Sequence, residues 1–236
     1  MNVIERKKRI LELLENNEYL SVEELVEKIG ASKATIRRDI RFLDEKEHLV
    51  TRFRGGVTLN ETPRKEDPAF IIEERMVQNR DSKIEIGKMA AELIEDGDSI
   101  FIDAGSTTYH MIEFITAKDI KVVTNGILNI LPLIDKGIET YILDGYVKMK
   151  SKSVQGTDAV SKIDKFNFDK AFLGTRGVDK EKGYTSTDSY DGLLKSATIN
   201  RADKTYVLAD ESKLDVKEFY TFAKYDEVTL VTNVNY

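Results

Sequence analysis

The middle of the chain reads Ser99-Ile100-Phe101-Ile102-Asp103-Ala104-Gly105-Ser106-Thr107-Thr108. The apolar run at its start predicts a short buried strand. A glycine and three hydroxyl residues then lead into a helix, since Ser and Thr favour helix N-termini. Glycine also lets the backbone approach an anion closely, and free N–H groups at a helix N-terminus bind phosphate oxygens. The stretch therefore predicts either a phosphate-binding loop at residues 105–108 or an ordinary helix cap.

The residues on both sides of this stretch alternate between helical and strand patterns. An amphipathic helix is predicted at residues 83–94. Further strands are predicted at residues 120–124, 139–143, 170–173, 205–209 and 227–231. Strands that alternate with helices predict a mostly parallel α/β sheet covered on both faces. Ligands of such sheets bind at the carboxyl ends of the strands, which favours the phosphate-binding loop.

Small, hydroxyl-bearing or cationic residues also follow several of the other strands. They lie at residues 124–126, 173–177 and 210–213, and Lys195 lies on a helix between the last two segments. Each has a plainer explanation as turn chemistry or solvated surface. Their repeated placement at strand ends nevertheless favours one shared ligand pocket.

A polar stretch separates this α/β region from the beginning of the chain. Residues 60–68 read Asn-Glu-Thr-Pro-Arg-Lys-Glu-Asp-Pro and hold two of the three prolines. Proline removes a backbone donor and restricts the preceding residue, so the stretch predicts a linker. We place the domain limits at residues 1–58, 59–75 and 76–236.

The first domain has the pattern of short helices joined by tight turns. Ser21 and Glu24 form a capping box that opens one helix, and Gly30 suits the left-handed residue that ends it. Ser32 caps a further helix from residue 33 to about residue 46. Two alternating runs around a Gly-Gly turn then predict a hairpin. This order predicts a helix-turn-helix over residues 20–39, followed by a wing.

Basic side chains collect on the last helix and the hairpin of this domain. Residues 33–54 carry seven Lys or Arg and four acids, whereas the whole chain has a net charge of −6. A solvated helix face explains the charge alone equally well. A recognition helix would use such residues to contact phosphates and base edges of DNA. The candidate DNA-binding residues are Ser32, Lys33, Thr35, Arg37, Arg38, Arg41, Arg52 and Arg54.

The order and spacing of these motifs resemble the DeoR family of transcriptional regulators. In the first domain the matching motifs are Arg6-x-x-x-Ile10-x-x-x-Leu14, Ser32-x-x-Thr35-Ile36-Arg37-Arg38-Asp39-Ile40 and Arg52-x-Arg54-Gly55-Gly56-Val57. In the second they are Asp-x-Gly-Ser-Thr-Thr, Val-x-Thr-Asn, Leu-Gly-x-x-Gly-Val-x-x-x-x-Gly-Tyr-Thr and Leu-Ala-Asp-x-Ser-Lys, in the order of the DeoR sensor domain. The resemblance covers nearly the whole chain.

The resemblance implies a winged helix-turn-helix joined to an α/β sensor domain similar to type A ribose-5-phosphate isomerase. It implies a repressor of a sugar-metabolism operon whose binding to double-stranded operator DNA is modulated by a phosphorylated sugar. Residues 105–108 would hold the phosphate. The other pocket residues implied are Asp103, Thr124, Asn125, Gly174, Lys195 and Lys213. Arg176 departs from the family pattern, which is commonly neutral or acidic at this loop position, and we expect it to add a second anion contact. We expect a homodimer or homotetramer, without a metal or other cofactor.

Two other functions stay open. The first is a phosphosugar isomerase with an accessory DNA-binding head. Isomerisation needs a carboxylate base. The isomerase relatives carry an Asp-Gly-Ala-Asp-Glu loop, whereas residues 173–177 here are Leu-Gly-Thr-Arg-Gly. We therefore expect a binding protein rather than an enzyme. The second is an adaptor whose helical head binds protein.

Composition excludes several classes of site. The 236 residues include no cysteine, which excludes disulfides, thiolate zinc sites and cysteine nucleophiles, and the two histidines leave little material for a His-based metal site. No apolar run approaches the roughly 20 residues that a bilayer span needs, and the N-terminus lacks the apolar core of a signal peptide. We therefore expect a cytoplasmic protein without membrane association.

Overall fold

The computed structural model describes residues 3–15, 17, 19–45, 50–53, 55–59 and 71–236. The chain divides into two compact units, Met1–Pro68 and Ala69–Tyr236. Residues 60–70 of the expected linker lie outside the described residues. Residues 72–75 of that expected linker belong to a helix of the second unit, α4 (Ile72–Val77).

The first unit is a three-helix arrangement with a small antiparallel sheet. Its elements are α1 (Val3–Glu15), β1 (Leu20–Ser21), α2 (Val22–Ile29), α3 (Lys33–Glu45), β2 (Val50–Phe53) and β3 (Gly56–Leu59). The sheet order is β1-β3-β2, so a short strand that we did not predict joins the predicted hairpin. Buried apolar residues from all three helices and from the hairpin form one core.

The predicted start and end of the turn helix are confirmed. Ser21 Oγ accepts a hydrogen bond from Glu24 N, and Glu24 Oε2 accepts one from Ser21 N at 2.7 Å. Gly30 ends α2 with φ 72° and donates its N–H to Val26 O. Because both ends of α2 are fixed, the turn directs the chain into α3 at a defined angle.

The second unit is built on a parallel sheet. Within residues 71–236, six strands pair in the order β14-β12-β9-β4-β5-β6, and every pair is parallel. The strands are β4 (Ser99–Ile102), β5 (Lys121–Thr124), β6 (Glu139–Ile142), β9 (Phe168–Gly174), β12 (Ala202–Leu208) and β14 (Thr229–Val231). All six overlap predicted strands, which confirms the predicted fold class.

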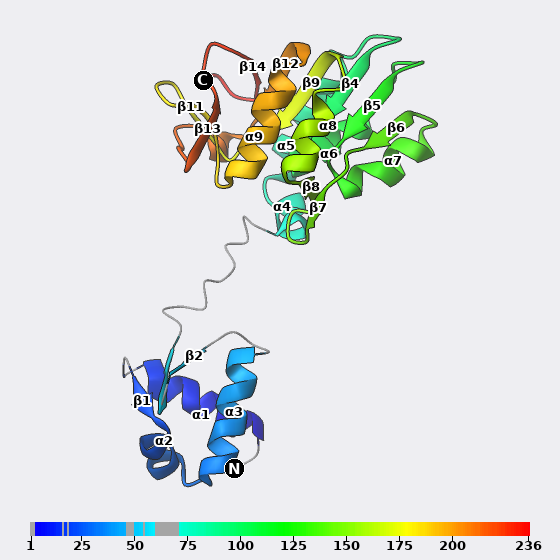
Figure 1. Ribbon diagram of the computed structural model, residues 1–236. Helices are drawn as coiled ribbons and strands as arrows, with labels where there is room; N and C mark the ends of the chain where they lie inside the picture. The colour runs from blue at the N-terminus through cyan, green and yellow to red at the C-terminus, as the bar shows by residue number, and fades with distance from the viewer. Residues whose placement is uncertain (1–2, 16, 18, 46–49, 54, 60–70) are drawn as a thin grey trace. The chain divides into compact units, whose positions relative to one another are not determined.

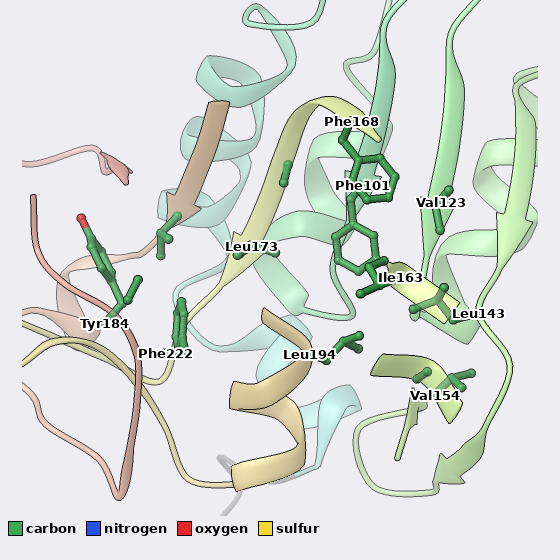
Figure 2. Close-up of a cluster of buried hydrophobic side chains, with 14 of the residues drawn as sticks. Phe101, Val123, Leu143, Val154, Ile163, Phe168, Leu173, Tyr184, Leu194 and Phe222 are labelled. Carbon is green, nitrogen blue, oxygen red and sulfur yellow. The ribbon is translucent and has the colours of Figure 1, made fainter. Parts of the chain in front are cut away.

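Helices cover both faces of this sheet (Figure 1). They are α5 (Arg80–Ala91), α6 (Ser106–Ile112), α7 (Ile130–Asp135), α8 (Thr157–Ile163) and α9 (Ser189–Ile199). Alternate residues of β4 enter different cores: Ile100 and Ile102 pack with α5, α6 and α7, whereas Phe101 packs with α8 and α9. Figure 2 shows the second of these clusters, in which the Phe101 and Phe168 rings lie 5.7 Å apart between centroids.

Shorter elements surround the sheet. The hairpin of β7 (Tyr146–Lys148) and β8 (Ser153–Gln155) and the antiparallel sheet of β10 (Gly177–Asp179), β11 (Gly183–Ser186) and β13 (Tyr220–Ala223) were not predicted. Residues 71–236 also include the 3-10 turns η2 (Ile127–Asn129) and η3 (Glu211–Lys213). No helix in the described part of the chain is long and apolar enough to span a bilayer.

Helices α5 and α6 approach each other closely at Gly87, and this contact yields a stability prediction. A Cβ at Gly87 would lie 2.9 Å from the Met111 backbone nitrogen. Alanine gains about 0.5–1 kcal/mol over glycine in a helix, but overpacking costs about 1–3 kcal/mol. We expect Gly87→Ala to lower the free energy of unfolding by roughly 1–2 kcal/mol in chemical denaturation.

The matched control is Met89→Ala on the same helix, where the side chain is 40% exposed. It should change the free energy of unfolding by less than about 0.5 kcal/mol. Equal stability of the two variants would show that the α5–α6 contact does not require glycine.

Candidate DNA-binding surface and ligand pocket

Helix α3 presents its arginines to solvent. Arg37, Arg38 and Arg41 are exposed, whereas the neighbouring Ile36 and Ile40 are buried in the core. Arg37 and Arg41 also line a shallow groove between α3 and the hairpin, with Arg52 of β2 on its other side. A basic groove beside an exposed helix suits a duplex whose backbone carries closely spaced phosphates.

The other described residues of the predicted DNA-binding set, Ser32, Lys33, Thr35 and Arg52, have protein partners in this unit. Ser32 Oγ accepts the Thr35 N–H at 3.2 Å and so caps α3, as predicted. Lys33 forms an ion pair with Glu23, and Arg52 forms one with Asp44 at 2.5 Å. Arg54 lies outside the described residues. The exposed pairs are weak and can open to exchange partners.

Asp39 faces the protein rather than the groove. Its carboxylate is buried and accepts hydrogen bonds from Arg6 of α1, at 2.5 Å from Nε and 3.2 Å from Nη2. This two-point contact joins α1 to α3. The acid in the Arg-Arg-Asp run therefore orients the helix that carries the arginines.

In the second unit, a pocket opens over the carboxyl ends of the central strands. The chain proceeds from β4 to β5 and β6 in one direction, and β9, β12 and β14 extend the sheet in the other. The loops after β4 and β9 therefore diverge and leave a crevice, the usual ligand site of such sheets. We call this crevice the sensor pocket. Its walls come from those loops, the loop after β12, the β7–β8 hairpin, α4 and α9.

Most of the predicted ligand residues line the sensor pocket. These are Asp103, Gly105, Ser106, Thr107, Gly174, Arg176, Lys195 and Lys213. A Cβ added to Gly105 would lie 3.0 Å from Thr108 Oγ1 and 3.9 Å from Gly174 Cα, so a side chain there would narrow the crevice. No described side chain caps α6 at Gly105, which leaves the first N–H groups of the helix for another partner.

Thr108, Thr124 and Asn125 do not line the described pocket, contrary to our expectation. Both threonine hydroxyls and the Asn125 side-chain oxygen bind the backbone of the strand ends instead, while the buried Asn125 Nδ2 has no hydrogen-bond partner among the described residues. Thr108 Oγ1 donates to Asp103 O at 2.7 Å, and Thr124 Oγ1 donates to Ile102 O at 2.6 Å. Asn125 Oδ1 accepts the Ala104 N–H at 2.8 Å. These hydrogen bonds fix the position of the loop after β4, although the three residues do not line the pocket themselves.

A buried ion cluster occupies the floor of the pocket. The Lys195 ammonium lies between Asp103 Oδ2, at 3.0 Å, and Asp191 Oδ1, at 2.5 Å. Burial acts to lower the pKa of Lys195, but the two carboxylates outweigh it and raise the pKa above its ordinary value. Asp103 also accepts the Gly174 N–H at 3.0 Å, so one carboxylate connects the ends of β4 and β9.

Four cations of the pocket were not predicted. Among the described residues, seven Lys or Arg and four Asp line the pocket, a surplus of three positive charges. The four are Arg75, Lys83, Lys148 and Lys150. The burial of Lys83 could have been predicted from the sequence, because Lys83 lies three residues before buried Ile86 and therefore on the apolar face of α5. The position of Arg75 could not have been predicted in this way, since Arg75 lies in the stretch that we assigned to the linker.

Lys83 connects α4 to the pocket. Its ammonium is buried and donates to Arg75 O at 2.6 Å and to Gln78 O at 2.7 Å. Burial lowers the pKa of Lys83 to about 8, opposed by Asp210 and assisted by the neighbouring cations. Lys83 is therefore a cation whose charge changes close to neutral pH.

Asp210 is the acid at the centre of these cations. It is 1% exposed, and its Oδ1 accepts hydrogen bonds from Asn79 Nδ2 at 2.9 Å and Ser212 N at 3.1 Å. Burial acts to raise its pKa, but these hydrogen bonds and the nearby lysines lower it overall. Oδ2 has no hydrogen-bond partner among the described residues, so it can accept a hydroxyl from a ligand.

The described residues contain no cluster of His, Asp and Glu that could hold a metal ion. The pocket instead combines a surplus of cations with carboxylates that accept hydroxyl hydrogens. This chemistry suits a small anion that also carries hydroxyl groups.

Comparison with known proteins identifies the family. Residues 6–63 match the DeoR-like helix-turn-helix domain, and residues 78–234 match the DeoR C terminal sensor domain. The HTH-type transcriptional regulator FruR of Bacillus subtilis is 39% identical over 97% of this chain and 90% of its own length. The HTH-type transcriptional repressor GlcR of the same organism is 32% identical over 96% of this chain and 86% of its own.

Among solved structures, ribose 5-phosphate isomerase A from Methanocaldococcus jannaschii is similar with a TM-score of 0.43 and 20% identity, over 58% of this chain and 55% of the isomerase. The two domain matches together cover most of the chain and agree with the winged helix-turn-helix and the parallel α/β sheet described above. The chain belongs to the DeoR family of transcriptional regulators.

Proposed function

We propose that this regulator is a repressor of a sugar-metabolism operon, and that a phosphorylated sugar in the sensor pocket modulates its binding to operator DNA. The observation that carries the proposal is the surplus of three positive charges around Gly105 in a chain whose net charge is −6. A phosphate dianion would offset two of these three charges, and the hydroxyls of a sugar would bind Asp210 and Asp103. The similar protein GlcR is named a transcriptional repressor, which supports repression rather than activation.

The pocket would bind the sugar phosphate without converting it. An isomerase needs a carboxylate that is free to take a proton from carbon. Asp103 and Asp191 are both engaged with the Lys195 ammonium, and the loop after β9 carries Arg176 where a further acid would be needed. We assign the unpaired Oδ2 of Asp210 to a ligand hydroxyl rather than to proton transfer from carbon. Turnover of ribose 5-phosphate that is lost in an Asp103→Asn variant would contradict this part of the proposal.

The sign of regulation depends on which DNA-binding state the ligand favours. A ligand shifts the operator affinity only if it binds one arrangement of the protein better than another. We propose a homodimer or homotetramer, because paired recognition helices match the half-sites of a palindromic operator.

For the DNA-binding surface, we predict that an Arg37→Ala/Arg41→Ala variant binds duplex DNA more weakly and with less dependence on salt. Each lost phosphate contact should lower the slope of log affinity against log salt by about 0.9. Fluorescence anisotropy with a random duplex at several salt concentrations measures the slope.

The control for this variant is Arg9→Ala. Arg9 is exposed on α1 and pairs with Glu12, away from the groove. An unchanged slope in the Arg37→Ala/Arg41→Ala variant would remove the groove from the proposed DNA interface.

For the sensor pocket, we predict that phosphorylated sugars raise the melting temperature and that the parent sugars do not. Lys213→Ala should weaken sugar-phosphate binding by about tenfold, the value of one charge-assisted hydrogen bond. Its DNA affinity without ligand should stay unchanged. A thermal-shift panel and isothermal titration measure both effects.

The matched control is Lys217→Ala, because Lys217 is an exposed lysine that does not line the pocket. If no sugar phosphate shifts the melting temperature of the wild-type protein, the sensor proposal is wrong.

The pKa of Lys83 gives a prediction for pH. Because burial holds this pKa at about 8, Lys83 loses its positive charge as the pH rises through that value. Anion affinity should be full below about pH 7 and should fall by up to tenfold per pH unit above pH 8. Sulfate is a suitable probe, since its own charge is constant in this range. A Lys83→Met variant should lack the fall, and an identical fall in that variant would assign it to another group.

A further inference from the structure

Arg75 brings a positive charge into the sensor pocket from outside the sheet. It lies on α4, the first described helix of the second unit, which follows directly after the segment from the DNA-binding unit. A Cβ built on Gly105 would lie 4.0 Å from Arg75 Nη2. The guanidinium therefore lies beside the loop after β4, at the place where the proposed phosphate binds.

Among the described residues, no acid lies within hydrogen-bond or ion-pair distance of the Arg75 guanidinium. Burial and the nearby charge of Arg176 lower the pKa of Arg75, while Asp103 raises it. Arginine nevertheless stays charged in proteins, so the half-buried cation carries an unfavourable free energy that a bound anion would remove.

Helix α4 depends on the pocket for its own stability. It has six residues and no side-chain cap at Ile71, and so short a helix does not form by itself in water. The contacts that hold it include the Lys83 bonds to Arg75 O and Gln78 O, the bond of 2.9 Å from Ile72 N to Lys150 O, and the buried Ile72 side chain. The His110 ring also lies 3.4 Å from Met76 O, and Lys152 forms an ion pair with Glu73. Lys83 and Lys150 both line the pocket.

We propose that Arg75 binds the anionic group of the effector directly, and that α4 is the element through which this binding reaches the segment leading to the DNA-binding unit. The inference rests on the proposed anion pocket. An anion held by the Gly105 loop and by Arg75 joins α4 to the sheet. Its loss removes that connection, and α4 is then held by its remaining contacts with Lys83, Lys150, Lys152 and His110 and by the buried Ile72 side chain. The anion-bound and anion-free states therefore differ at α4, where the segment from the DNA-binding unit joins the second unit.

Hydrogen–deuterium exchange of the full chain tests this inference with inorganic phosphate as the probe. In the wild-type protein, phosphate should slow exchange of the amides at residues 104–108 and at residues 75–78 by about tenfold. In Arg75→Gln, phosphate should still slow residues 104–108 but should leave residues 75–78 unchanged. Retained slowing at residues 104–108 also shows that the variant pocket is folded.

The matched control is Arg80→Gln, which removes one positive charge from an exposed residue that does not line the described pocket. It should behave like the wild type. Slowing of residues 75–78 in Arg75→Gln, or slowing of residues 104–108 alone in the wild type, would overturn the inference and leave the pocket proposal intact. If neither phosphate nor any sugar phosphate slows residues 104–108, the pocket proposal fails, and this inference with it.

Discussion

The parallel pairing of β4 with β9 is the constraint on which the rest of the second unit depends. Both strands are buried on both faces, and the chain leaves them toward opposite edges of the sheet. Their following loops must therefore separate, which opens a crevice without any special sequence. Asp103 then joins the two loops through Gly174 N and Lys195, so the crevice keeps one shape.

Charge is used differently in the two units. In the first unit the buried pair of Arg6 and Asp39 orients α3, while the DNA-facing arginines stay exposed. In the second unit the charges converge. Lys195 is neutralised by two acids, whereas the Lys83 ammonium donates to backbone carbonyls and no described acid forms an ion pair with Arg75. The first arrangement holds an element in place, and the second leaves positive charge available to an anion.

Sequence reasoning succeeded where the signal is local. The strand at residues 99–102 and the Ser21 cap follow from neighbouring residues, and both are observed. Gly105 lines the pocket, and its role in binding phosphate stays a prediction. Sequence reasoning failed where a role depends on distant partners. Thr124 and Asn125 carry suitable chemistry but bond to the adjacent strand end. Arg75 reaches the pocket only because α4 folds against Lys150 and Lys83, and nothing in its own neighbourhood predicts that position.

The cationic lining of the sensor pocket has a kinetic consequence. Residues 63–236 carry 24 Lys or Arg and 30 acids, so the attractive charges of the pocket sit within a protein that is negative as a whole. At low ionic strength the net charge repels an approaching anion over distances of about 30 Å, whereas at physiological salt the reach falls to about 8 Å. Added salt should therefore increase the association rate of an anionic effector while it weakens the attraction between the bound effector and the cations of the pocket. Association and dissociation rates would then both increase with salt, and the residence time of the effector would shorten.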